Sequence, residues 1–171
     1  MARAVLLTGG NLGDVKRTLQ AAQQLINARV GAVLRCSHRY ESSAWGFASD
    51  AVFSNQAIEV STDLSPLEVL DALQQIECEL GRNRAAETLE KARTGADYVS
   101  RPIDIDIIFY DDAVIEEERL TVPHPRLALR EFALVPLCEI MRDKRHPVLG
   151  STVGQMLDAL RAQSSDRTCG E

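Results

Sequence analysis

Residues 101–110 read R-P-I-D-I-D-I-I-F-Y, which sets two aspartates into the middle of an otherwise apolar, strand-like segment. Because side chains alternate between the two faces of a β-strand, the alternating isoleucines and Phe109 are expected on one face and Asp104 and Asp106 on the other. Successive positions on one face lie only ~6.5 to 7 Å apart. Two carboxylates at that spacing repel each other unless a cation or strong hydrogen-bond donors lie between them. The segment therefore calls for a charged partner on its polar face.

The aspartate pair admits two interpretations. A charge on a strand can simply protect a sheet from edge-to-edge aggregation, as a lone aspartate often does. Two carboxylates on one face favour Mg²⁺ instead, because this ion typically takes one or two carboxylates and completes its shell with water and substrate phosphates. The segment before the strand is basic and could neutralise such phosphates; the alternative is a solvated loop whose charges keep it soluble. Its basic residues are Arg82, Arg84, Lys91, Arg93 and Arg101.

Hydrophobic periodicity along the chain predicts an α+β fold. Ser65, Pro66 and Glu68 form a strong helix start, and Gly81 is the matching stop. The order of the elements suggests a ferredoxin-like mixed or antiparallel sheet with helices packed against it in three αβα layers. Strands are expected at 2–8, 32–40 and 52–61 and over the aspartate segment, and helices after Asp14, at 65–81, at 132–141 and at 152–161.

The remaining segments are expected to be less regular. Gly9-Gly10-Asn11 lacks the lysine and hydroxyl of a phosphate-binding loop and is expected to be a tight turn between strand and helix. Residues 82–102 show little apolar periodicity and are expected to form a long basic loop, and such loops are usually functional or disordered. Residues 113–121 are expected to pair back as a hairpin.

Length and composition indicate one globular domain, since the chain has 171 residues, 45% of them hydrophobic and 26% charged. We expect this domain at residues 1–161 and a flexible tail at 162–171. The net charge of −6 disfavours broad capture of nucleic acid. The four cysteines lack the spacing of a metal site or a disulfide framework, and neither a signal segment nor a membrane-spanning apolar run is found. A cytoplasmic monomer without nucleic-acid or membrane partners is expected.

Several segments together resemble one known family. They are G-G-N-L-G-D near the start, Y-E-S-S-A-W-G-F, F-S-N-Q-A, Q-Q-I-E-C-E-L-G-R-N-R, R-P-I-D-I-D-I-I-F-Y and R-L-T-V-P-H-P-R. The chain resembles the 6-hydroxymethyl-7,8-dihydropterin pyrophosphokinases of folate biosynthesis over roughly residues 4 to 160. That resemblance implies transfer of the pyrophosphoryl group of ATP to the hydroxymethyl group of the dihydropterin, with release of AMP. It also implies two Mg²⁺ ions that bridge Asp104 and Asp106 to the triphosphate.

The resemblance further implies which residues contact ATP. Arg82 and Arg101 would lie on mobile loops and act with the two aspartates, reaching the phosphates when the site closes. A row along the helix at 65–81 could face a ligand, and it contributes Leu70, Gln74 and Glu77. The expected ATP-binding residues are Leu70, Gln74, Glu77, Arg84, Thr121, His124 and Arg130.

A second set is implied for the pterin. Asn55 suits the edge of that ring because an amide offers both a donor and an acceptor, and Phe53 or Phe132 offers a stacking face. Trp45 could close over a flat heterocycle or simply pack in the core. The expected pterin-binding residues are Ser42, Ser43, Trp45, Phe53, Asn55 and Phe132.

The chain departs from the family pattern at several places, and two rival functions fit part of it. Gly10 stands where the family commonly has serine, and the loop between Arg84 and Arg101 is longer than usual. Two-metal nucleotidyl transferases with a ferredoxin-like palm also carry aspartates on one strand face, but their leaving group is pyrophosphate and not AMP. A small nucleic-acid or regulatory binding module is the third candidate, and the acidic charge balance argues against it for RNA.

Overall fold

The computed structural model describes residues 1–43, 52–95 and 101–168. The strands of its main sheet are β1 Ala2–Gly10, β2 Ala32–Cys36, β3 Tyr40–Ser43, β4 Val52–Thr62 and β5 Asp104–Tyr110. The α-helices are α1 Val15–Arg29, α2 Pro66–Glu79, α3 Arg84–Thr94, α4 Glu131–Met141 and α5 Val153–Thr168. A short 3₁₀ helix spans Leu127–Leu129.

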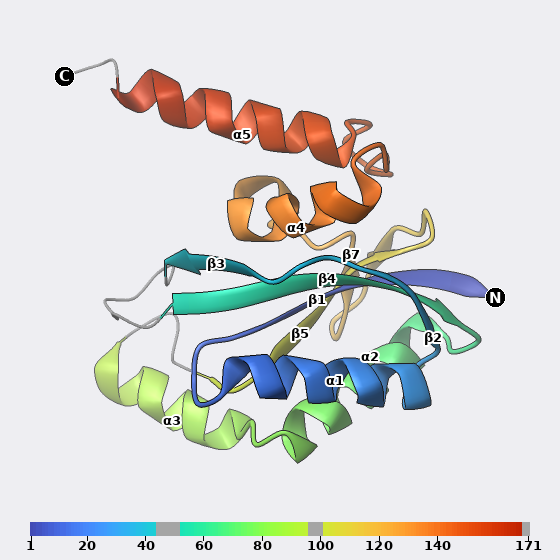
Figure 1. Ribbon diagram of the computed structural model, residues 1–171, viewed down its shortest axis with the longest axis vertical. Helices are drawn as coiled ribbons and strands as arrows, with labels where there is room; N and C mark the ends of the chain where they lie inside the picture. Colours follow the sequence, from blue (N-terminus) through green and yellow to red (C-terminus); the bar gives the residue numbers. More distant parts are fainter. Residues whose placement is uncertain (44–51, 96–100, 169–171) are drawn as a thin grey trace.

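Helices cover both faces of one antiparallel sheet (Figure 1). In the described residues the sheet is five-stranded with the order β2-β4-β1-β5, and β3 also pairs with β4. Helices α1 and α2 pack on one face, and α4 and α5 pack on the other. The predicted α+β class and the three αβα layers are therefore confirmed.

The core under α1 and α2 follows the predicted apolar patterns. Leu6 of β1, Ile58 of β4 and Ile105 of β5 are fully or almost fully buried there. They meet Ile26 of α1 and Leu73 of α2, which come from the helical stripes expected in those segments. Each such aliphatic side chain contributes about 1.5–3 kcal/mol relative to an exposed one. This core holds β1 and β5 side by side, which positions the aspartates.

The first turns of α1 and α2 carry the N-terminal caps that the sequence predicted. The side chain of Asp14 accepts the amide of Arg17 at 3.2 Å at the start of α1. At the start of α2, Ser65 and Glu68 form a capping box, in which the amide of Ser65 donates to Glu68 at 2.7 Å. Gly81 follows α2 with a φ of 102°, a backbone conformation that favours glycine.

A bulge in β5 moves Phe109 to the face opposite the one predicted. Leu6 pairs with Ile107 and Val5 pairs with Phe109, so Ile108 is an extra residue between these pairs. Ile108 and Phe109 both join the core under α4 and α5. The prediction that Phe109 shares a face with the isoleucines is wrong, because strict alternation holds only while the strand has no bulge.

Two segments of the sheet differ from the sequence prediction. The strand expected at 32–40 is divided into β2 and β3, both antiparallel to β4. The break occurs where the hydroxyl of Ser37 accepts the amide of Ala57 at 2.9 Å, so a side chain replaces a backbone carbonyl in the ladder. In addition, β1 continues through Gly9 and Gly10, which belong to the strand and not to a turn.

The segment expected to be a long basic loop contains α3. The side chain of Asn83 caps this helix by accepting the amide of Ala86 at 3.0 Å, and Gly95 ends it with a φ of 70°. No residue of α3 is buried, which explains why the segment shows no apolar periodicity. Its alanines, glutamates, lysine and arginines favour a helix by intrinsic propensity. The loop prediction is therefore wrong for residues 84–94.

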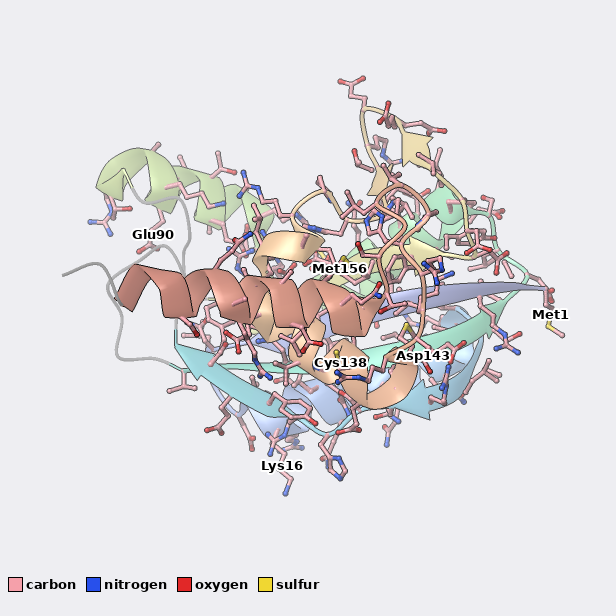
Figure 2. All side chains as sticks on the ribbon, turned by 90° about the horizontal axis from the view of Figure 1, so that it is seen from above. Met1, Lys16, Glu90, Cys138, Asp143 and Met156 are labelled. Atoms are coloured by element: carbon pink, nitrogen blue, oxygen red, sulfur yellow. The ribbon has the colours of Figure 1, made fainter. Side chains whose placement is uncertain are left out.

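The C-terminal part supplies the second helical layer. Seen from above, α5 crosses α4, with Met156 on α5 and Cys138 on α4 (Figure 2). Helix α4 contains the predicted segment 132–141, while α5 begins at Val153, one residue after the expected start, and continues to Thr168, past the expected end at 161. The predicted tail thus begins inside a helix, and the domain limits remain a prediction. None of the helices in the described part of the chain combines the length and apolar character needed to cross a membrane.

The predicted hairpin is confirmed as a separate two-stranded sheet. Its strands are β6 Ile115–Glu116 and β7 Thr121–Val122, which pair with each other. The amide of His124, just after β7, donates to the carbonyl of Ile108 at 3.1 Å. The hairpin therefore returns the chain to the outer edge of β5.

Candidate active site

The register of three strands aligns the candidate site residues. Asp104 on β5 lies opposite Gly9 on β1, and Gly9 lies opposite Asn55 on β4. Residues that are opposite one another in neighbouring strands point to the same face of a sheet. Asp106 lies in the next row of this face, opposite Leu7. The face that carries both aspartates is therefore the one covered by α4 and α5.

Because Gly9 has no side chain, a gap remains between Asp104 and Asn55. A Cβ at Gly9 would lie only 2.4 Å from Oδ1 of Asn55. Asn55 is 5% exposed, and within the described residues its Nδ2 atom has no hydrogen-bond partner. A buried N–H without an acceptor costs about 1–3 kcal/mol. The site thus favours a ligand that brings an acceptor to Asn55.

One cavity joins the aspartates to predicted pterin-binding residues. Its walls include Ser42, Phe53, Asn55 and Phe132, together with Asp104, Asp106, Arg101 and Arg130. The guanidinium of Arg130 lies over the ring of Phe132, with its carbon 5.5 Å from the ring centre. The cavity volume is about 40 Å³, room for a few water molecules. The walls must therefore separate before a bicyclic ring can enter.

Asp106 has an electrostatic environment that suits a bound cation. Burial raises the pKa of Asp106 well above its usual range, and the neighbouring charge of Asp104 raises it further, while Arg130 opposes both effects. In the described part of the chain, no three acidic, histidine or cysteine side chains are grouped to hold a metal ion. Two carboxylates fit Mg²⁺, which takes its remaining oxygens from water and phosphates.

Hydrogen bonds connect the end of β1 to the residues just before β5. Asn11 exchanges two hydrogen bonds with the backbone of Arg101, one from its own amide and one to its side-chain oxygen. A Cβ at Gly10 would lie 2.4 Å from the carbonyl oxygen of Pro102, so this approach requires glycine where the family commonly has serine. Arg101 is 6% exposed, and its Nη1 lies 3.9 Å from Oδ2 of Asp104. The structure therefore anchors Arg101, which was expected on a mobile loop.

A second cavity, of about 680 Å³, lies where α2 ends and α3 begins. Three predicted ATP-binding residues, Gln74, Glu77 and Arg84, line it together with Arg82. The volume is within the range of about 300–1,000 Å³ that is usual for small-molecule sites. The second cavity therefore gathers part of the predicted ATP-binding set, whereas Arg130, also predicted to bind ATP, lines the first cavity with the predicted pterin-binding residues.

Glu77 is 1% exposed and links α2 to the aspartate strand. Its oxygens accept the guanidinium of Arg82, that of Arg84 at 2.8 Å and the backbone amide of Ile105 at 3.2 Å. Burial raises the pKa of Glu77, although Arg82 opposes that effect. Arg82 is itself 6% exposed and lies among carboxylates in this structure, and its approach to the phosphates when the site closes remains a prediction.

His124 is held in one orientation at the end of the hairpin. Its Nδ1 accepts the amide of Arg126 at 3.2 Å. Burial lowers the pKa of His124 to about 4, and the charge of Arg130 contributes to this shift. The imidazole is therefore neutral at neutral pH, with Nε2 as its remaining N–H donor.

The other predicted residues are less closely associated with the two cavities. Thr121 is exposed on β7, and Leu70 packs partly buried against the core under α1 and α2. Neither lines either cavity. Trp45 and the side chain of Ser43 lie outside the described residues, so their predicted pterin contacts remain predictions. ATP contacts for Thr121 and Leu70 remain predictions as well.

The sequence prediction of the site did not include Gly9, Asn11 and Glu87. Gly9 and Asn11 belong to a segment that was read only as a turn, and two glycines at a strand end were the available signal of a close approach. Glu87 is bound by Arg82 through both its oxygens, at 2.9 and 3.1 Å. No sequence signal marks that contact, because it depends on α3.

Comparison with known proteins identifies close matches over most of the chain. The sequence model of the family described as 7,8-dihydro-6-hydroxymethylpterin-pyrophosphokinase matches residues 5–142. A 2-amino-4-hydroxy-6-hydroxymethyldihydropteridine pyrophosphokinase of Porphyromonas gingivalis is 36% identical over 141 residues, which cover 82% of this chain and 91% of that protein. The enzyme of the same name from Synechocystis is 39% identical over 156 residues, covering 91% and 74%. That from Bacillus subtilis is 39% identical over 138 residues, covering 80% and 77%.

Solved structures support the fold. The crystal structure of wild-type HPPK-DHPS of Plasmodium falciparum with pteroate superposes with a TM-score of 0.78 at 15% sequence identity. The match covers 98% of this chain and 46% of that longer chain. At this identity the likeness concerns the fold, and it agrees with the layers described above.

Proposed function

This chain belongs to the family of 7,8-dihydro-6-hydroxymethylpterin-pyrophosphokinases, and we propose that it carries out their reaction with ATP as donor and Mg²⁺ held by Asp104 and Asp106. The hydroxymethyl oxygen of the dihydropterin attacks the β-phosphorus of ATP. The bond between the α,β-bridging oxygen and the β-phosphorus breaks, AMP leaves, and the hydroxyl proton is released. The product is the pterin diphosphate used in folate biosynthesis.

The cavity beside the aspartates accounts for pterin binding. Phe53 and Phe132 provide apolar walls for a flat ring, and the unpartnered Nδ2 of Asn55 donates to an acceptor on the ring edge. Gly9 provides the space between that edge and Asp104. The hydroxymethyl group then points from the ring pocket towards the aspartates.

Positioning and charge account for the phosphate chemistry. Arg101 and Arg130 line the cavity with the two aspartates and would hold phosphate oxygens as the oxygen–phosphorus bond forms. When bound, Mg²⁺ would neutralise phosphate charge, polarise the reacting phosphoryl group and orient it for in-line attack. Because burial and Asp104 oppose ionisation of Asp106, these carboxylates favour a divalent partner. The proposal includes two Mg²⁺ ions, which the two carboxylates and a triphosphate would bind jointly.

One structural observation supports this proposal in addition to family membership. Asp104, Asp106, Asn55, Phe53 and Phe132 come from two strands and a helix, and they line a single cavity. A metal site alone does not need the aromatic walls, and a pterin pocket alone does not need two carboxylates. The combination of carboxylates and aromatic walls suits the transfer of a pyrophosphoryl group to a pterin.

The test is an assay of the products. The purified protein is incubated with ATP, Mg²⁺ and 6-hydroxymethyl-7,8-dihydropterin, and the nucleotides and pterins are separated by chromatography. AMP is expected in an amount equal to the pterin diphosphate formed. Release of pyrophosphate with an adenylylated pterin would identify a nucleotidyl transferase instead, and no turnover at all would favour a binding module. A monomeric state and a cytoplasmic location remain predictions, which sedimentation and cell fractionation test.

A further inference from the structure

A third cavity, of about 500 Å³, adjoins the one assigned to the pterin. The two cavities have three wall residues in common, Ser42, Arg130 and Phe132. The other walls of the third cavity come from β3, from the 3₁₀ helix, from α4 and from α5, which contributes Leu160 and Ser164. Helix α4 lies between α5 and the sheet (Figure 1). Phe132 is therefore a partition between a small cavity and a large one.

The pterin cavity is too small for its proposed ligand. Its volume is only about 40 Å³, whereas a small-molecule site usually provides about 300–1,000 Å³. One wall has to move by about the thickness of an aromatic ring, ~3.5–4.0 Å, before a flat ring fits. A side chain in a close-packed protein can move that far only where space already exists beside it. The third cavity provides such space next to Phe132, and Val135 and Leu160 give it an apolar lining that suits an aromatic ring.

Of the two aromatic walls, Phe132 is the one that its backbone restrains less. Phe53 lies on β4, opposite Ser42 in the ladder with β3. Phe132 is in the first turn of α4, and within the described residues this helix lacks the side-chain cap that fixes the first turns of α1, α2 and α3. An uncapped first turn readjusts more easily than a strand in the middle of a ladder. The ring of Phe132 is only partly buried, although it packs against the core under α4 and α5.

We propose that Phe132 is the movable wall of the pterin pocket, and that its ring moves into the third cavity when the pterin enters. This inference rests on the pterin site of the proposed function. It makes Leu160 and Ser164 positioning residues, because they limit the space available to Phe132 without touching the pterin. The family model matches residues 5–142, so α5, which carries both positions, lies outside the matched range.

Two neighbouring serines of α5 offer a matched pair of variants. Ser164 lines the third cavity, and Ser165 does not. Both side chains are exposed, and each hydroxyl donates to the carbonyl four residues earlier, Ser164 to Leu160 at 3.3 Å and Ser165 to Arg161 at 3.2 Å. Ser164→Trp places a bulky ring at the cavity, whereas Ser165→Trp makes the same chemical change outside it. Affinity for 6-hydroxymethyl-7,8-dihydropterin is measured by titration calorimetry with Mg²⁺ and α,β-methylene-ATP present.

The two tryptophan variants are expected to differ in pterin binding. Ser164→Trp should weaken the affinity at least about fivefold, because the ring of Phe132 then has to enter an occupied space. Ser165→Trp should differ from the unchanged protein by less than about twofold, as surface substitutions usually do. At saturating pterin both variants should keep the kcat of the unchanged protein, since the reacting groups are the same. Equal pterin affinities for the two variants would overturn the proposal.

A smaller side chain at position 132 tests whether Phe132 transmits the effect. Phe132→Leu needs less space, so adding Ser164→Trp to this variant should weaken pterin binding by less than about twofold. An undiminished effect in the leucine background would contradict a role for the ring.

Nuclear Overhauser effects in the unchanged protein follow the ring directly. Effects between the Phe132 ring and the methyl groups of Leu160 should strengthen when the pterin binds, and unchanged intensities would contradict the movement. This measurement needs no substitution, so it holds even if a tryptophan variant fails to fold, which thermal unfolding of each variant reveals.

The outcomes separate this inference from the function on which it rests. If the unchanged protein binds no pterin, the pterin site is wrong and the movable wall is wrong with it. If the pterin binds and Gly9→Ala weakens that binding, but Ser164→Trp has no effect, only the movable wall is wrong.

Discussion

Asn11 and Arg101 are joined by two hydrogen bonds that tie the end of β1 to the entrance of β5. The amide of Asn11 donates to the carbonyl of Arg101 at 3.1 Å, and the amide of Arg101 donates to Oδ1 of Asn11 at 2.9 Å. The second bond needs a side-chain acceptor, so the backbone position of Arg101 depends on the identity of residue 11. This relationship makes Asn11 a positioning residue for a guanidinium that faces Asp104.

Substitution of Asn11 is expected to reduce turnover more than pterin binding. Asn11→Ala removes an interaction worth about 0.5–1.5 kcal/mol, which corresponds to a loss of kcat of about two- to tenfold if Arg101 acts in the transition state. Asn11→Asp keeps the acceptor oxygen and should retain more of the activity. Steady-state AMP formation gives kcat, and fluorescence titration gives pterin affinity. An alanine variant with unchanged kcat would show that Arg101 is positioned by other contacts.

Gly9→Ala is expected to impair pterin binding selectively. The new methyl group would lie 2.4 Å from Oδ1 of Asn55 and push this amide out of its position. We expect pterin affinity to fall by about tenfold or more, the equivalent of about 1.4 kcal/mol. Binding of a fluorescent ATP analogue serves as the internal control and should be unchanged. Equal loss of both affinities would point instead to a general disturbance of the sheet.

Asp104→Ala is expected to abolish most of the activity without unfolding the protein. The Asp104 side chain faces the cavity and not a core, and its loss removes a carboxylate proposed to hold Mg²⁺. We expect kcat to fall by at least about a hundredfold. Asp112→Ala is the control, because Asp112 is an exposed aspartate paired with Lys144 outside the site. Near-normal turnover of Asp104→Ala would refute the metal assignment.

Asp106→Asn is expected to stabilise the metal-free protein while it impairs catalysis. The folded-state pKa of Asp106 is raised, so ionisation costs folding free energy once the pH exceeds the unfolded value of about 3.9. That cost grows as the pH rises towards the folded pKa, and an amide does not incur it. Thermal unfolding in the absence of metal at about pH 8 should therefore give a higher Tm for the variant. Added Mg²⁺ should raise the Tm of the unchanged protein only, and a lower variant Tm without metal would contradict the argument.

His124 is expected to stay neutral well below its ordinary titration range. Its folded pKa is lowered to about 4, so the folded state resists protonation that the unfolded chain accepts below about 6.5. His124 therefore costs stability as the pH falls from about 6.5 towards 4 and has no such effect above that window. Proton NMR of the imidazole should show no titration of His124 near pH 6.5. A midpoint near 6.5 for His124 would contradict its burial.

Local sequence rules predicted much of the fold because the signals lie within a few residues of one another. The capping box of Ser65 and Glu68 and the alternation around Asp104 are both of this kind. The prediction failed for α3, whose apolar periodicity is missing because the helix buries no side chain. It failed for Phe109 because a bulge in β5 depends on how that strand pairs with β1.

The sequence by itself determined that two carboxylates share a strand face, since backbone alternation requires it wherever the strand is regular. It also determined where α1 and α2 begin, since their caps are made by neighbouring residues. Only the tertiary structure decided that Gly9 separates Asp104 from Asn55 and that Arg82 pairs with Asp104. These relationships join segments that are distant along the chain, so they depend on strand register and on the packing of α2 and α3 rather than on any local pattern.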